Sequence, residues 1–295
     1  WVFDELFRDA GTQLEDHLQL APLEILARHA WLAGGQLDLF ADVERSADAI
    51  GAFAGLREAQ GYREFVSRAQ RTYQALEAPF IRASRPTPVS LVARAGISGA
   101  ARLLATQPFA SLWSALGEHF KDPRLQQLFG RYATYVSSSP FLAPATLMLI
   151  AHVEQAGVWQ VEGGMHQVAR SLAALASRLG TEIRYNAEVA EILVDGGRFT
   201  GVRLHDGDRL QGRAGIVNTD VAALASGQLG AGPRHAVPAV SRNKRSLSAV
   251  TWAMHAQTQG FPLVRHNVFF SRDYPGEFAK LTRDAMLPEE PTVYV

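Results

Sequence analysis

The chain has 295 residues, of which 47% are hydrophobic, so it is long enough to bury the core of one large domain or two ordinary ones. Its 29 basic and 29 acidic residues balance, so no overall charge attracts nucleic acid, and we expect no nucleic-acid partner. The absence of cysteine excludes disulfides, thiolate nucleophiles and cysteine-ligated metals, and it agrees with a cytoplasmic location.

The two ends and the longest uncharged stretch also carry information. The chain starts with Trp1 rather than methionine, and Thr292–Val295 has the residue types of a strand, so we expect a fragment of a longer protein. Residues 132–153 contain no Asp, Glu, Lys or Arg and have about the length of a membrane span. Because Pro140 and Pro144 interrupt this stretch, we expect two helices joined by a loop instead.

Residues 1–156 are predicted to be mostly helical, with one β-hairpin near the start. The hairpin joins Leu20–Trp31 to Gln36–Phe40 through a turn that contains Gly34 and Gly35. Prolines separate the helical patterns that follow. The predicted helices are Glu44–Ala59, Tyr62–Ile81, Leu91–Thr106, Phe109–Phe120, Pro123–Val136 and Pro144–Gln155.

From residue 157 onward the pattern alternates between strand and helix. A short strand at Val158–Val161 leads through Gly163 and Gly164 into a helix with one apolar face, which ends at Gly180. The pattern indicates half of a nucleotide-binding α/β sheet with a hairpin inserted. Further predicted elements are strands at Glu182–Asn186, Val189–Asp195, Phe199–Leu204, Leu210, Ile216–Val217, Leu247–His255 and His266–Phe270, and helices after Asp220 and over Asp273–Ala285.

The glycine pair allows two interpretations. The backbone N–H groups and the dipole of the following helix could face a phosphate or a flavin ring. The same glycines also fit a plain strand-to-helix turn, because a GG pair is not a G-x-G-x-x-G fingerprint. His166, in the first helical turn, is interpreted as a surface residue rather than a ligand.

No usual hydrolytic or metal-binding motif is found, so we predict no metal site and name no catalytic residue. His152 and Glu154 lie two apart on a predicted helix, where side chains diverge, so they make a poor metal pair. Cofactor-borne chemistry stays open. A basic loop between Arg234 and Arg245 is either a solvated loop or a contact with an anionic membrane surface.

A series of short motifs resembles one enzyme family, the bacterial phytoene desaturases, which are FAD-dependent carotenoid desaturases. The motifs are SPFxAP at 139–144, GVW at 157–159 with GGM at 163–165, NAEV at 186–189, GVRL at 201–204 and VNTD at 217–220. Four segments, at 129–135, 143–146, 151–155 and 245–252, look most like the branch that desaturates the C-3,4 bond of 1-hydroxy or 1-methoxy carotenoids. Glu162 and Thr219 also favour this branch.

The resemblance implies a partial glutathione-reductase-like FAD-binding fold with a mixed α+β substrate domain and a helical lid. It implies segments at 1–43 (start of the substrate domain), 44–156 (helical substrate tunnel and membrane-facing lid), 157–230 (FAD-binding) and 231–295 (substrate-domain sheet and helix). The implied cofactor-binding residues are Gly163, Gly164, Met165, Val189, Asn218 and Asp220, and the implied substrate-binding residues are Phe141, Leu142 and Trp159.

The expected protein is thus a cytoplasmic, peripherally membrane-associated desaturase with an apolar carotenoid substrate. Two alternatives remain open at this point. One is a related flavoenzyme, such as a phytoene desaturase, a carotenoid isomerase or an amine-oxidase-like protein. The other is a module that only binds apolar ligands or docks on a membrane.

Overall fold

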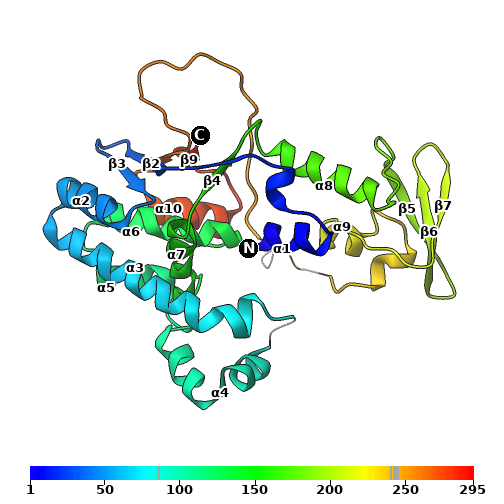
Figure 1. Cartoon of the computed structure of the whole chain (residues 1–295), viewed down its shortest axis with the longest axis horizontal. Coiled ribbons are helices and arrows are strands. Elements are labelled where there is room, and N and C mark those ends of the chain that lie inside the picture. Colours follow the sequence, from blue (N-terminus) through cyan, green and yellow to red (C-terminus); the bar gives the residue numbers. More distant parts are fainter. Residues whose placement is uncertain (85–86, 240, 242–245) are drawn as a thin grey trace. The chain divides into compact units, whose positions relative to one another are not determined.

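The computed structural model describes residues 1–84, 87–239, 241 and 246–295 (Figure 1). The chain forms two compact units, and each is assembled from segments that are distant in the sequence. One unit comprises Trp1–Leu18 and Met165–Arg245, and the other comprises Gln19–Gly164 and Ser246–Val295. The four functional segments expected from the resemblance stay a prediction.

The first unit is built on a three-stranded antiparallel sheet in the order β5-β6-β7. The two predicted glycine turns, at 195–197 and 205–208, join its strands. The N-terminal helix α1 buries Phe7 completely, and the Phe7 ring lies 5.1 Å from the His17 ring. The elements are α1 (Val2–Asp9), η1 (Leu14–Asp16), α8 (His166–Arg178), β5 (Val189–Asp195), β6 (Arg198–Leu204), β7 (Arg209–Gln211), α9 (Val221–Ser226) and η5 (Gly232–His235).

The second unit contains a four-stranded mixed sheet in the order β3-β2-β8-β9. The predicted hairpin is confirmed as the antiparallel pair β2 and β3, whereas β2 and β8 run parallel. The segment Leu20–Pro22 is a separate strand, β1, that pairs with β4. The strands are β1, β2 (Ile25–Trp31), β3 (Gln36–Phe40), β4 (Trp159–Val161), β8 (Asn267–Phe270) and β9 (Val293–Tyr294).

Helices make up most of the second unit (Figure 1). The predicted break between the first two helices was misplaced, because α2 ends at Gly55, whose φ of 101° belongs to the left-handed region that favours glycine. Several predicted helices end in 3-10 or π turns. The elements are α2 (Val43–Ala54), α3 (Leu56–Leu76), η2 (Glu77–Ile81), α4 (Pro88–Ala105), α5 (Leu112–His119), α6 (Pro123–Gly130), η3 (Arg131–Val136), η4 (Ala145–Met148), α7 (Leu149–Gln155), α10 (Tyr274–Ala279) and η7 (Lys280–Asp284).

Three predicted strands were wrong. Glu182–Asn186, Ile216–Val217 and Leu247–His255 contain strand-forming residues but do not form strands. A strand needs a neighbour with which to exchange backbone hydrogen bonds, and within the described part of the chain no strand lies alongside these segments. Leu247 instead donates its N–H to the carbonyl of Ser137, 3.0 Å away.

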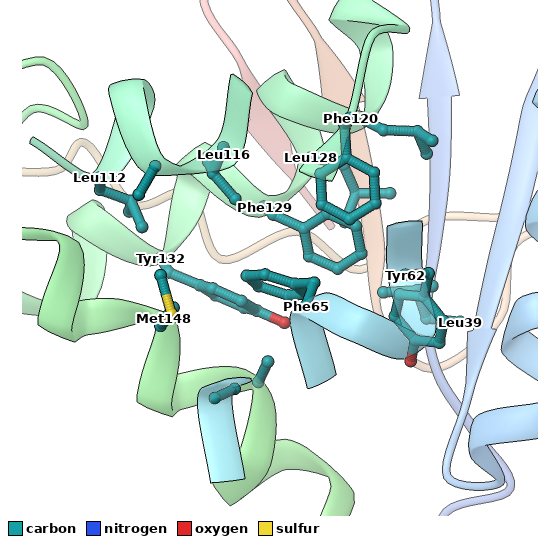
Figure 2. Close-up of a cluster of buried hydrophobic side chains, with 14 of the residues drawn as sticks. Leu39, Tyr62, Phe65, Leu112, Leu116, Phe120, Leu128, Phe129, Tyr132 and Met148 are labelled. Carbon is teal, nitrogen blue, oxygen red and sulfur yellow. The ribbon is translucent and has the colours of Figure 1, made fainter. Parts of the chain in front are cut away.

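The core of the second unit forms where α3 meets α5 and α6 (Figure 2). Tyr62, Phe65 and Ala69 recur at helical spacing along α3 and are almost fully buried. The Phe65 ring lies 5.4 Å from Phe120 and 4.8 Å from Phe129. Burying a phenylalanine side chain contributes about 1.5–3 kcal/mol, so this cluster gives α3 a defined position against its neighbours.

Two expectations concern membranes. Among the described residues, no helix is long and apolar enough to cross a bilayer. The basic loop ends in Arg242, Asn243, Lys244 and Arg245, which lie outside the described residues, so the interpretation of that loop stays a prediction.

Candidate functional site

The glycine pair lies in the turn between β4 and α8. Gly163 and Gly164 have φ angles of 77° and 88°, in the left-handed region where a Cβ would be strained. The Gly164 N–H donates to the carbonyl of Val161, at 3.0 Å, and this bond closes the turn. A Cβ placed on Gly164 would meet no described atom within 4 Å. The turn geometry therefore accounts for the glycines, and the open side of Gly164 leaves room for a ligand to approach.

The start of α8 has free hydrogen-bonding capacity. Met165, the residue before the helix, already has helical backbone angles, and its side chain is 67% exposed. No described side chain caps this end, and its first turn carries no acidic residue. The first N–H groups of a helix have no partner within it, so α8 offers donors and a positive dipole end to an acceptor. His166 is exposed.

The other predicted cofactor residues, Val189, Asn218 and Asp220, belong to the first unit together with Met165, whereas Gly163 and Gly164 belong to the second. Val189 opens β5 and pairs with Leu204 of β6. Asn218 is exposed in a segment without regular structure. The Asp220 carboxylate caps α9 by accepting a 2.6 Å hydrogen bond from the Ala222 N–H. Asp220 therefore has a structural role that is independent of any cofactor.

Of the three predicted substrate residues, Phe141 belongs to an aromatic cluster. Its ring lies 4.8 Å from Trp113 and 6.1 Å from Phe278, and Tyr274 lies 5.0 Å from Phe278. The Tyr274 hydroxyl is buried and has no hydrogen-bond partner among the described residues. Burial, and then the nearby charge of Glu277, raise the pKa of Tyr274, so the hydroxyl is a neutral donor in apolar surroundings.

The other two predicted substrate residues are exposed. Leu142 is 75% exposed and Trp159 is 51% exposed. The Trp159 ring covers Gly157, where a Cβ would come within 2.3 Å of the ring. Gly157 thus allows the indole to fold back on the preceding backbone.

A buried polar cluster in the same unit was missed by the sequence analysis. Arg131 and Glu154 form an ion pair of 3.1 Å with side chains only 14% and 13% exposed. The same carboxylate accepts hydrogen bonds from the hydroxyls of Tyr132, at 2.7 Å, and Tyr135, at 3.0 Å. Arg131 and Glu154 are the charged residues directly before and after the uncharged stretch 132–153. Their place at its two ends was the feature of the sequence that could have indicated the pair.

The charges in this cluster affect its neighbours. Burial lowers the pKa of Arg131, but the negative charge of Glu154 and the interactions with Tyr132 and Tyr135 together outweigh this effect, so the net pKa is raised and the guanidinium stays charged. His29 on β2 is fully buried, and its Nε2 atom has no described partner. Burial, reinforced by the charge of Arg131, lowers the pKa of His29 well below its usual value, so this imidazole is neutral.

His152 and Glu154 diverge as predicted. The His152 ring packs 4.9 Å from Tyr73, while Glu154 pairs with Arg131. Among the described residues, no group of three or more His, Asp or Glu side chains is arranged to hold a metal ion. Among the described residues of the second unit, the geometry offers an aromatic cluster that includes Phe141 and the buried Tyr274 hydroxyl, which has no partner there. The uncapped start of α8 belongs to the first unit.

Comparison with known proteins identifies the family. Residues 6–255 match the sequence profile of flavin containing amine oxidoreductases. The chain belongs to this family. It is 52% identical to a hydroxyneurosporene desaturase from Rubrivivax gelatinosus and 46% identical to one from Cereibacter sphaeroides. Both alignments cover 100% of this chain, which spans 56% and 59% of the length of those relatives.

These findings confirm the resemblance to carotenoid desaturases and, at the level of the family, the flavin cofactor. Among solved structures, a putrescine oxidase triple mutant redesigned in cofactor binding is similar with a TM-score of 0.47 and 13% identity, over 81% of this chain and 47% of that one. In the described chain, a mixture of α and β structure is present as predicted.

Proposed function

We propose that this chain is part of an FAD-dependent carotenoid desaturase that introduces a C=C bond at C-3,4 of a 1-hydroxy or 1-methoxy carotenoid. The observation that carries the proposal is the identity of 52% and 46%, along the whole chain, with two proteins named hydroxyneurosporene desaturase. The motif series at 139–144, 157–165, 186–189, 201–204 and 217–220 supports it independently of overall identity.

The glycine pair fits the cofactor. Positive φ angles at Gly163 and Gly164, an open side at Gly164 and an uncapped start of α8 give the backbone access to a ligand that accepts hydrogen bonds. The proposed cofactor-binding residues are Gly163 and Gly164 in the second unit and Met165, Val189, Asn218 and Asp220 in the first. When bound, FAD would supply the two-electron oxidation that removes hydrogen from a CH–CH bond.

The protein's own contribution would be to position the substrate and exclude water. A polyene stabilises developing charge through its own conjugation, so no protein acid or base is assigned. Phe141 and its aromatic neighbours provide an apolar surface, and the exposed Leu142 and Trp159 extend the apolar contact area. We infer that the buried Tyr274 hydroxyl donates to the oxygen of the substrate's end group, because a buried donor without a partner favours a ligand that supplies an acceptor.

The substrate also defines a location. A carotenoid is an apolar chain that dissolves in a bilayer, so the enzyme must reach that bilayer to collect it. We therefore propose a cytoplasmic protein that is peripherally associated with a membrane surface and has the helical block 44–156 as tunnel and lid.

The test uses the full-length protein with FAD and a 1-hydroxycarotenoid in liposomes, and follows product mass and the visible spectrum. A desaturase gives a product two mass units lighter, with a red-shifted spectrum. An unchanged mass with bound flavin would support the carotenoid isomerase alternative, and an absence of bound flavin would refute the proposal.

The Tyr274 assignment has its own test. Y274F removes one hydroxyl and keeps the ring, so we expect a raised KM for a 1-hydroxycarotenoid and an unchanged KM for the same chain without the hydroxyl. Equal effects on both substrates would mean that Tyr274 only packs the cluster.

A further inference from the structure

The chain from residue 78 to residue 117 has an unusual charge distribution. It contains four arginines and no aspartate, glutamate or lysine, in a protein whose overall charge is balanced. The segment comprises the end of η2, the helix α4 and most of α5. A positive segment of this kind favours a partner with the opposite charge.

Large apolar side chains are exposed in the same segment. Phe109 is 94% exposed, Val89 80%, Leu104 66% and Phe80 49%. Single exposed apolar residues are ordinary, but here they come from η2, both ends of α4 and the loop that follows it. Leu103, which is 8% exposed, holds the inward side of α4.

The helix α4 is a defined element with few neighbours. It begins with a capping box, in which the Ser90 N–H donates to the Thr87 hydroxyl at 3.1 Å and the Thr87 N–H donates to the Ser90 hydroxyl at 2.8 Å. Gly96 interrupts it with a φ of 67° and a ψ of −177°, so the helix is kinked. Its main packing is against η2 and α3, and Figure 1 shows it beyond the end of α3.

No described acidic residue pairs with the arginines of α4. Arg94 and Arg102 are exposed and form no ion pair with any described residue. Arg94 makes one hydrogen bond, of 3.4 Å, to the Ser84 carbonyl. Arg82, just before the helix, does pair with Glu77 at 3.1 Å. Within the described part of the chain, two cations without an acidic partner therefore lie on a helix that also exposes Val89 and Leu104.

We propose that this surface, defined by Phe80, Val89, Arg94, Arg102, Leu104 and Phe109, docks on the surface of a bilayer that contains anionic lipids. Exposed apolar side chains combined with arginines are the properties of helices that lie in a membrane interface, where the apolar groups enter the acyl boundary and the cations contact headgroup phosphates. The inference rests on the membrane association proposed above, and it names the surface and the lipid charge that mediate it.

The experiment measures binding of the full-length protein to vesicles that contain no carotenoid. One set is phosphatidylcholine, and the other is an equal mixture of phosphatidylcholine and phosphatidylglycerol. Each basic residue near an anionic surface strengthens binding by about fivefold, so R94Q/R102Q is expected to bind the mixed vesicles about 25-fold more weakly. L104S/F109S is expected to weaken binding to both vesicle types.

The matched control is R198Q/R209Q, which removes two exposed arginines from the sheet of the other unit that also form no ion pair with described residues. This control should bind the mixed vesicles like the unaltered protein. The proposal would be overturned if R198Q/R209Q weakened binding as much as R94Q/R102Q, or if binding did not depend on phosphatidylglycerol.

Sedimentation of the unaltered protein and L104S/F109S tests a second copy as the occupant. A shift from dimer to monomer with unchanged vesicle binding would overturn the membrane assignment. Desaturation by the unaltered protein is assayed separately in detergent micelles, so failure of the enzymatic proposal is distinguished from failure of the docking surface.

Discussion

The buried ion pair between Arg131 and Glu154 makes a sharp prediction about stability. Glu154 accepts hydrogen bonds from Arg131 and from the hydroxyls of Tyr132 and Tyr135, at 2.7–3.1 Å. In E154Q the side chain keeps its shape but loses its charge, and one of its oxygens becomes an NH2 group that faces other donors. Arg131 would then be a largely buried cation without a counter-charge.

The size of the effect follows from the burial of both partners. Removing one partner of a buried pair costs about 3–5 kcal/mol. Because the two side chains are still 14% and 13% exposed, water screens them in part, and we expect the lower end, about 3 kcal/mol, in the free energy of unfolding. A loss of that size lowers Tm by about 6–12 °C in a domain of about 150–250 residues. Y132F, which removes one donor, should cost about 1–3 kcal/mol.

The assay is urea and thermal unfolding followed by circular dichroism. The matched control is E44Q, because Glu44 also pairs with an arginine, Arg63, at 2.7 Å, but both side chains lie at the surface. Exposed pairs of this kind often contribute nothing measurable, so Tm should not change in E44Q. If E154Q lost no more stability than E44Q, the reasoning that the cluster is buried and electrostatically coupled would be refuted.

Three further predictions concern glycines and one histidine. G61A should destabilise the protein by about 1–3 kcal/mol in urea unfolding, because the new Cβ would come within 2.2 Å of a carbonyl oxygen at the end of α5. G117A, whose Cβ would lie 4.0 Å from its nearest described neighbour, should instead stabilise the protein by up to about 1 kcal/mol, and similar losses in both variants would contradict this. Burial lowers the pKa of His29, so as the pH falls from 7 to 5 this histidine takes up a proton in the unfolded state but not in the folded state. The free energy of unfolding should therefore fall by about 2 kcal/mol over this range. H29F should remove that part of the pH dependence, and an unaltered slope would show that His29 does not cause it. G164A should lower the ratio of FAD to protein in the full-length enzyme, whereas G180A, with a similar φ of 91° and equally open surroundings at the other end of α8, should not. Equal retention in both would argue against the cofactor contact at Gly164.

Several elements were predictable because their causes are local. The hairpin β2–β3 follows from two apolar runs around Gly34 and Gly35, and the helix α8 follows from an apolar stripe between Gly164 and Gly180. The predicted strand at Leu247–His255 failed because residue types describe only the propensity to be extended. Whether a strand forms depends on a partner that offers backbone hydrogen bonds, and no described strand does so there.

The family could be predicted from the residues alone, through the order and spacing of the motifs along the chain. The local turns and helix faces could be predicted from the glycines and from apolar periodicity. Packing determines that Arg131 and Glu154 form a buried pair and that Phe141 lies in an aromatic cluster while Leu142 is exposed. It also determines that no described acidic residue pairs with the arginines of α4. These features depend on which segments pack together. Burial and the distance between charges, rather than residue type, determine what an ionisable or apolar side chain contributes.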